Sequence, residues 1–172
     1  MRWTSIATAG TMAAIALACA ERTTPPEPGT EPEPVPDRAT PPVDFSALAL
    51  AADVAVMESF PVQLRGTLTV RNPTDRPIQF DVGGCPVFLR VYDPAGEIAW
   101  DQGDGAICTM ILRTVTLEPG AAETFETATA SAADVLGEDL PDGTYGVGVY
   151  LAPVEGGQPE ASAGEVELAI PR

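Results

Sequence analysis

GGCPVFLRVYDPAGEIAWDQGDGAICTMILRTVTLEPG, residues Gly83 to Gly120, is the stretch that decides the fold. In its first part Val87, Leu89 and Val91 are apolar, and the residues between them are aromatic or charged. Successive side chains of a strand point to opposite faces of a sheet. This period of two therefore predicts a strand that buries one face.

The rest of the stretch continues through clear turn signals. Residues 93–96, DPAG, have Pro and Gly where a β-turn needs them, so residues 97–100 are expected to return as a hairpin partner. Residues 101–106, DQGDGA, form a polar loop. The β-branched run at 107–117 predicts a long strand that ends at the Glu-Pro-Gly turn of 118–120.

Outside this stretch, short apolar alternations separated by turn residues recur along the chain. They predict strands at residues 46–57, 62–71, 78–82, 122–130, 144–151 and 165–170. The alanines of the first of these segments also suit a helix, but its alternation favours a strand. Residues 131–142 are expected to hold one helical turn, capped by Ser131 with Asp134 three residues on. The pattern predicts an all-β, antiparallel β-sandwich, with a barrel as the alternative.

The composition excludes several kinds of function. The 172 residues include 25 acids against nine bases, all of them arginine, and no histidine. Residues 45–172 alone have 19 acids and six arginines, a net charge of −13, which makes nucleic-acid binding very unfavourable. Without histidine, Ser-His-Asp and Cys-His catalysis are excluded, together with most zinc sites that mix Cys with His.

The first nineteen residues are typical of an export signal. Arg2 gives a positive start, residues 5–18 form an apolar segment too short to span a membrane, and Cys19 follows directly. This ending resembles the lipobox of bacterial lipoproteins, in which the cysteine is lipidated and becomes the new N-terminus, although Ala16 stands where leucine is usual. The alternative is ordinary cleavage after Ala18. We expect a lipid-anchored protein of the bacterial cell envelope, or otherwise a secreted or soluble periplasmic one.

Residues 20–44 are predicted to be a disordered tether. The segment has eight prolines and six acids, and Val35 is its only large apolar residue before position 43. Such a composition buries too little apolar surface to offset the entropy of ordering, and it favours extended polyproline II. The folded domain is therefore expected at residues 45–172, which are enough for a core of ordinary size.

Two cysteines remain in the domain if Cys19 is lipidated. Cys85 precedes one predicted strand and Cys108 opens another. Export permits oxidation, and the close Cys-x-x-Cys spacing of redox sites is absent, so we expect a structural Cys85–Cys108 disulfide.

Four segments of the domain resemble the bacterial intracellular proteinase inhibitor (BsuPI-like) family. They are VRNPTDRPIQF at 70–80, FLRVYDPAGEIAW at 88–100, TLEPG at 116–120 and LPDGTYGVGVYL at 140–151. The resemblance implies an immunoglobulin-like β-sandwich and inhibition of serine proteinases. The resemblance assigns no functional role to any residue of this sequence. The export signal differs from the family, whose members are intracellular.

Other candidate chemistry is sparse. Asp101, Asp104 and Gly105 suit a calcium loop, but the EF-hand spacing is absent and a glycine-rich acidic turn is the far commoner explanation. No cofactor or metal site is predicted. Trp100 is expected to be a core residue packed on the disulfide, the alternative being an exposed binding anchor.

The expected function is non-catalytic binding of another protein, and its sharper form is inhibition of a proteinase. The alternative is a structural or assembly-supporting envelope lipoprotein. The loops at 101–106 and 153–159 are the predicted contact segments, because both are polar and lie between strands. An exposed, rigid apolar loop near Cys108 would favour inhibition. A smooth acidic surface would favour the structural alternative, and a deep pocket with convergent carboxylates would favour an enzyme.

Overall fold

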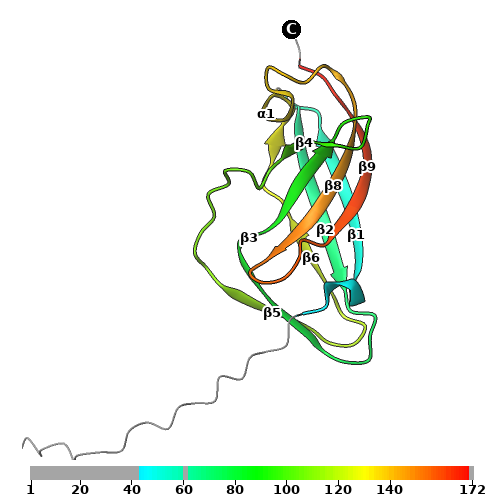
Figure 1. The fold of residues 1–172 in the computed structure, drawn as a ribbon, viewed down its shortest axis with the longest axis vertical. Coiled ribbons are helices and arrows are strands. Elements are labelled where there is room, and N and C mark those ends of the chain that lie inside the picture. Colours follow the sequence, from blue (N-terminus) through cyan, green and yellow to red (C-terminus); the bar gives the residue numbers. More distant parts are fainter. Residues whose placement is uncertain (1–42, 60–61, 171–172) are drawn as a thin grey trace, which may run out of the picture. The chain divides into compact units, whose positions relative to one another are not determined.

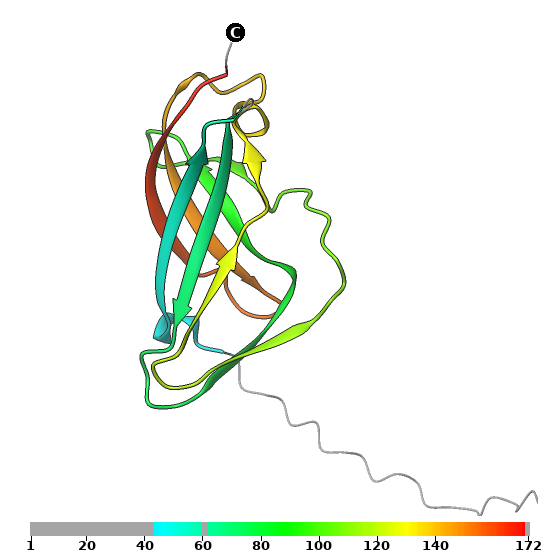
Figure 2. The same ribbon diagram turned by 180° about the vertical axis from the view of Figure 1, so that it is seen from behind.

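Two antiparallel sheets face each other in a computed structural model that describes residues 43–59 and 62–170. The first sheet has the order β1-β2-β6, with β7 also paired to β2, and the second has the order β4-β3-β8-β9, with β5 paired to β3. Figure 1 shows the second sheet in front and Figure 2 shows the first. The elements are η1 (Phe45–Ala47), β1 (Ala49–Met57), β2 (Gln63–Arg71), β3 (Ile78–Tyr92), β4 (Ile98–Asp101), β5 (Arg113–Leu117), β6 (Ala122–Glu126), β7 (Ala130–Ser131), α1 (Ala132–Leu136), β8 (Gly143–Pro153) and β9 (Glu160–Leu168).

The predicted all-β sandwich is confirmed for these residues; the predicted signal peptide and most of the tether lie outside them. The alternation in β2 places Leu64, Leu68 and Val70 fully inside the core. The first predicted strand is also a strand and not a helix, since β1 pairs with β2 along its whole length. Its apolar residues are only partly buried, because β1 is an edge strand that lies beside β9 of the other sheet.

The central strand β3 is longer than the alternation predicted. Its first part pairs with β5 and its second part with β8, and the register shifts between Val82 and Val87. In the second part Val87, Leu89 and Val91 are buried, as predicted. The two predicted strands are therefore one strand with an irregularity at residues 83–86, the position of Cys85.

A tyrosine hydroxyl fastens the corner before β8. The Tyr145 hydroxyl donates a hydrogen bond to the Pro141 carbonyl at 2.6 Å, as in the tyrosine corner of immunoglobulin-like sandwiches. The predicted helical turn is confirmed as α1, and the Ser131 hydroxyl accepts from the Asp134 amide at 3.0 Å in a capping box.

A buried asparagine links the two sheets at the end of β2. The Asn72 side chain is completely buried and donates to the carbonyls of Arg76 at 2.7 Å and Leu117 at 2.8 Å. Its own carbonyl accepts from the Thr74 amide at 2.9 Å. Because Leu117 belongs to β5, this one amide joins the turn after β2 to the second sheet.

Three predicted strands have different bounds in the structure. The strand predicted at 107–117 is β5 only from Arg113, and residues 106–112 are not strand. The strand predicted at 122–130 is interrupted between β6 and β7, and the last strand starts at Glu160 rather than at 165. Among the described residues, no helix is long and apolar enough to cross a membrane.

Candidate functional site

The segment between β4 and β5 presents an unusual amount of apolar surface. We call residues 106–112, AICTMIL, the apolar loop. Ile107 and Met110 expose 99% and 102% of their reference surface, and Ile111 and Leu112 expose 66% and 63%. Figure 2 shows this segment arching outside the strands. Single exposed apolar residues are ordinary, but four within six positions make this segment a candidate interaction site.

The apolar loop is fastened to β3 at two neighbouring points. Cys108 forms the predicted disulfide with Cys85, and their Cα atoms are 5.6 Å apart. Next to it, Thr109 lies against Gly84, where an added Cβ would be 2.7 Å from the Thr109 carbonyl oxygen. Any larger residue at position 84 would therefore push the loop away from the strand. The glycine and the cysteine of β3 together fix the start of the exposed segment.

The protrusion follows from a mismatch in length. Arg113 pairs with Val82 in the β3–β5 ladder, and Cys108 is bonded to Cys85. Between these two attachments β3 advances three positions, from 82 to 85, whereas the facing chain advances five, from 108 to 113. Two surplus residues cannot pair with β3, so the chain bows outward after Thr109. This geometry carries the next three side chains into solvent.

The main chain of the exposed segment is unpaired. In the part of the chain that the structure describes, the amides and carbonyls of residues 107–112 make no hydrogen bonds. The segment also carries no charge, although Arg113 directly follows it and pairs with Glu123. The apolar loop therefore leaves both side chains and main-chain groups largely free of contacts with the rest of the described domain, apart from the attachments at Cys108 and Thr109.

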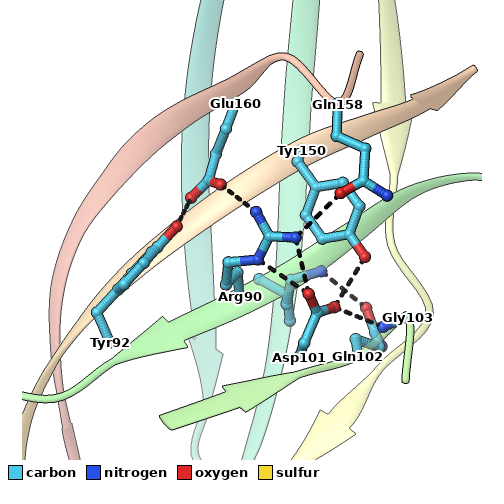
Figure 3. Close-up of polar contacts among 9 residues, drawn as sticks. Arg90, Tyr92, Asp101, Gln102, Gly103, Tyr150, Gln158 and Glu160 are labelled. Carbon is cyan, nitrogen blue, oxygen red and sulfur yellow. Dashed lines mark hydrogen bonds and ion pairs between the residues drawn. The ribbon is translucent and has the colours of Figure 1, made fainter. Parts of the chain in front are cut away.

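A polar cluster lies on the outer face of the second sheet, around Arg90 (Figure 3). We call it the arginine cluster; it comprises Arg90, Tyr92, Asp101, Tyr150, Gln158 and Glu160. The Arg90 guanidinium donates to Asp101 at 2.8 and 2.9 Å and to Glu160 at 2.7 Å. It also donates to Gln158 at 3.2 Å and lies 4.1 Å from the centre of the Tyr150 ring. With its donors occupied in this way, Arg90 is not an open anion site.

A glycine on β8 makes room for this arrangement. Glu160 of β9 extends across β8 to reach Arg90, and a Cβ on Gly148 would lie 2.8 Å from the Glu160 side-chain carbon Cδ. The Tyr92 hydroxyl donates to the same carboxylate. Three strands are thus tied together across the outer face by side chains distant in sequence.

Hydrogen bonding sets the protonation of the arginine cluster. Burial by itself raises the pKa of Asp101, but the hydrogen bonds from Tyr150, the Gly103 amide and Arg90 lower it more, so the carboxyl stays below its usual range. Burial and the hydrogen bond to Asp101 both raise the pKa of the Tyr150 phenol. The pair therefore consists of an ionised acid and a neutral phenol at neutral pH.

The arginine cluster holds the stem of the apolar loop. Asp101 accepts from the Gly103 amide at 2.8 Å. Gln102 exchanges two hydrogen bonds with Leu89 of β3, one through its amide at 2.9 Å and one through its side chain at 3.0 Å. The first residues after β4 are thus fixed to the sheet before the chain reaches Ala106.

The two predicted contact loops, 101–106 and 153–159, meet in the arginine cluster, because Asp101 and Gln158 both bind Arg90. Their polar side chains at these positions are engaged within the domain, and their role in partner contact stays a prediction. The Asp101 carboxylate of the suggested calcium loop is likewise bonded to protein groups. Within residues 43–59 and 62–170, no three Cys, Asp or Glu side chains are grouped to hold a metal ion.

The remaining predicted residues have different outcomes. Trp100 is partly buried, pairs with Val91 and packs against the core. Cys19 lies outside the described residues. Sequence reasoning placed the apolar loop in a strand because its residues suit a strand, and it missed Arg90 as the centre of a cluster. The sequence does contain a local signal for each feature. Gly83 and Gly84 precede Cys85, where the apolar loop is attached, and Gly146 and Gly148 lie on the outer face of β8, where Glu160 crosses to the arginine cluster.

Comparison with known proteins gives distant structural likeness only. No family model and no curated protein matches the chain. A structural genomics target is similar at 14% identity over 74% of this chain and 89% of that one, with a TM-score of 0.35. A Bordetella pertussis protein described as ApaA is similar at 16% identity over 73% and 93%, with a TM-score of 0.33. A β-glucosidase 3B from Thermotoga neapolitana is similar at 15% identity over 70% of this chain but only 17% of its own, with a TM-score of 0.34.

Proposed function

We propose that this protein is an exported lipoprotein, anchored in the cell envelope through Cys19, whose β-sandwich binds another protein without catalysis. The apolar loop is the binding element. The sharper form of the proposal is inhibition of a proteinase, as the resemblance to the BsuPI-like family implies. The single observation that carries the proposal is an apolar loop that is both exposed and fastened to β3 through the Cys85–Cys108 disulfide.

Exposure and anchoring together favour recognition. Apolar side chains in solvent are costly for the isolated domain, and burial in a partner returns about 25 cal/mol for each Å² covered. Because the loop is attached to β3 at Cys108 and Arg113, it loses less conformational entropy on binding than a free segment would, so more of this free energy appears as affinity. A structural lipoprotein without a ligand has no need for such a surface.

The charge of the domain indicates the kind of partner. The apolar loop is uncharged, whereas residues 45–172 have a net charge of −13. Such a surface favours a partner with an apolar cleft in a basic rim, because opposite charges accelerate encounter. It disfavours anionic lipid surfaces. Association is therefore expected to slow as ionic strength rises.

Comparative capture tests the proposal. The mature protein and a variant with Ile107, Met110, Ile111 and Leu112 all replaced by serine are used as bait in the same envelope extract. A control variant replaces Ile98, an exposed residue of β4, with serine. We expect a partner that the wild type and the control retain and the loop variant loses. Equal capture by all three would reject the loop as the binding element, and the structural alternative would then take its place.

Anchoring is tested separately. Cys19→Ala should prevent acylation and move the protein from the membrane fraction to the soluble fraction. The acyl group itself is checked by mass spectrometry of the mature N-terminal peptide. An unmodified N-terminus at Cys19, the product of ordinary cleavage after Ala18, or at a later residue contradicts lipidation in the wild-type protein.

A further inference from the structure

We infer that Met110–Ile111 is the reactive bond through which this protein inhibits a serine endopeptidase whose primary specificity pocket is apolar. The inference rests on the proposed binding role of the apolar loop and assigns its partner class and its central residue. Met110 would fill the specificity pocket, and the following bond would lie at the enzyme's nucleophile.

The exposed segment has the two properties that an endopeptidase cleft requires. Its main chain is unpaired from 107 to 112, so it can add to the enzyme as an extended strand, where main-chain hydrogen bonds give affinity and pockets give specificity. Between its two attachments, Cys108 and Arg113, the segment also presents Met110 as its most exposed apolar side chain, since Ile111 and Leu112 expose 66% and 63%. Thr109 is turned to Gly84, whereas Met110 is completely exposed.

The residue type sets the specificity class. Methionine is unbranched, flexible and uncharged, so it suits an apolar pocket such as that of chymotrypsin and not the aspartate-lined pocket of trypsin. The segment from 107 to 112 has no charge that would have to be buried in the cleft. The acidic domain around it then complements a basic rim on the enzyme.

Both sides of the bond are held on the same strand. On the N-terminal side, the disulfide fixes Cys108 to Cys85, two residues before Met110. On the C-terminal side, Arg113 pairs with Val82, two residues after Ile111. This double attachment distinguishes an inhibitor from an ordinary substrate, because the two new ends cannot diffuse apart after the bond is cut.

The chemistry follows from this attachment. The enzyme's serine oxygen bonds to the Met110 carbonyl carbon, the carbon–nitrogen bond breaks, and the Ile111 nitrogen takes a proton and leaves as an amine. Because that amine stays beside the acyl-enzyme, it can lose the proton and attack the ester, which restores the peptide bond and the serine hydroxyl. Water competes only slowly, and hydrolysis adds one water across the bond, giving a Met110 carboxylate and an Ile111 amine.

The test uses a substitution that should switch the inhibited enzyme from chymotrypsin to trypsin, instead of one that only abolishes inhibition. Inhibition constants of the mature wild-type protein are measured for chymotrypsin and trypsin, alongside Met110→Arg. We expect the wild type to inhibit chymotrypsin, and the variant to gain at least about 100-fold against trypsin and lose at least about 100-fold against chymotrypsin. Ile98→Arg is the matched control, since it places the same charge at another exposed apolar position, and it should leave both constants unchanged.

Peptide analysis of prolonged incubations locates the bond. We expect slow formation of one nicked species whose second chain begins Ile-Leu-Arg-Thr-Val. Rapid cleavage there with release of active enzyme makes the loop a substrate and overturns the inference, as do cleavage at another bond and a Met110→Arg variant that does not inhibit trypsin. If capture of a partner still depends on the apolar loop in those cases, the proposed binding function survives and only the reactive bond is rejected.

Discussion

Removal of the Cys85–Cys108 disulfide is expected to destabilise the domain while leaving its native sheets intact. The perturbation is the double substitution Cys85→Ala with Cys108→Ala. Cys108 lies in the apolar loop, outside the strands, so few native contacts depend on its position. The bond therefore acts mainly on the unfolded chain, whose freedom it limits.

The size of the effect follows from the span of the bond. The cysteines are 23 positions apart, so the closed loop has about 24 residues, for which the chain-entropy relation gives about 3 kcal/mol at 25 °C. A domain of this size has an unfolding entropy of about 270 cal/mol/K near its midpoint. The melting temperature should therefore fall by about 11 °C.

Urea unfolding followed by circular dichroism measures the change. The midpoint should fall, and the denaturant slope should rise because the unfolded chain without its cross-link exposes more surface. Hydrogen exchange should remain slow in β2, β3 and β8. A loss below about 1 kcal/mol would refute the loop-entropy account, and collapse of exchange protection in β3 would show that the bond maintains the native sheet instead.

Three other predictions concern the arginine cluster and the sheet corner. Gly148→Ala should displace Glu160 and lower the free energy of unfolding in urea by about 1–3 kcal/mol. Gly146→Ala is the control: its added Cβ would meet its nearest neighbour at 3.5 Å, so the free energy should fall by less than about 1 kcal/mol. Because the pKa of Asp101 is lower in the folded than in the unfolded state, its contribution to stability is complete above about pH 4–5 and is lost as the pH falls through the folded value. Asp101→Asn should therefore reduce the fall of the urea midpoint on acidification below about pH 4–5. Asn72→Ala should cost about 1–3 kcal/mol by the same assay, because the buried Leu117 carbonyl loses its donor, whereas the carbonyl of the exposed Arg76 still accepts from the Thr74 hydroxyl.

The sequence predicts best those strands that bury one face in the core. In β2 and in the second part of β3, the alternation of apolar residues matches the burial of Leu64, Leu68 and Leu89. In β8 the predicted inward residues Tyr145, Val147, Val149 and Leu151 do lie in the core, although Tyr150 of the outer face is buried as well. A period of two is decisive there because a shift of one residue would expose the whole apolar set.

The candidate site was less accessible to prediction. Ile107, Ile111 and Leu112 suit a strand, and hydrophobicity does not distinguish a face that packs inside the domain from one that packs on a partner. The protrusion depends on a two-residue surplus between the disulfide and the β3–β5 ladder, which is visible only once the register is known. The arginine cluster joins residues up to 70 positions apart, so no local sequence pattern predicts it.

The buried Asn72 also has a consequence for chemical ageing. Asparagine in proteins deamidates when the main-chain nitrogen of the next residue, after losing its hydrogen, attacks the side-chain carbonyl carbon and closes a five-membered succinimide ring. The next residue here is Pro73, whose nitrogen carries no hydrogen. The amide that joins the turn after β2 to Leu117 of the opposite sheet is therefore protected by its neighbour from becoming an aspartate. A carboxylate there would lose both donated hydrogen bonds and bring a charge to a position without solvent access, so the proline preserves the corner over the protein's lifetime.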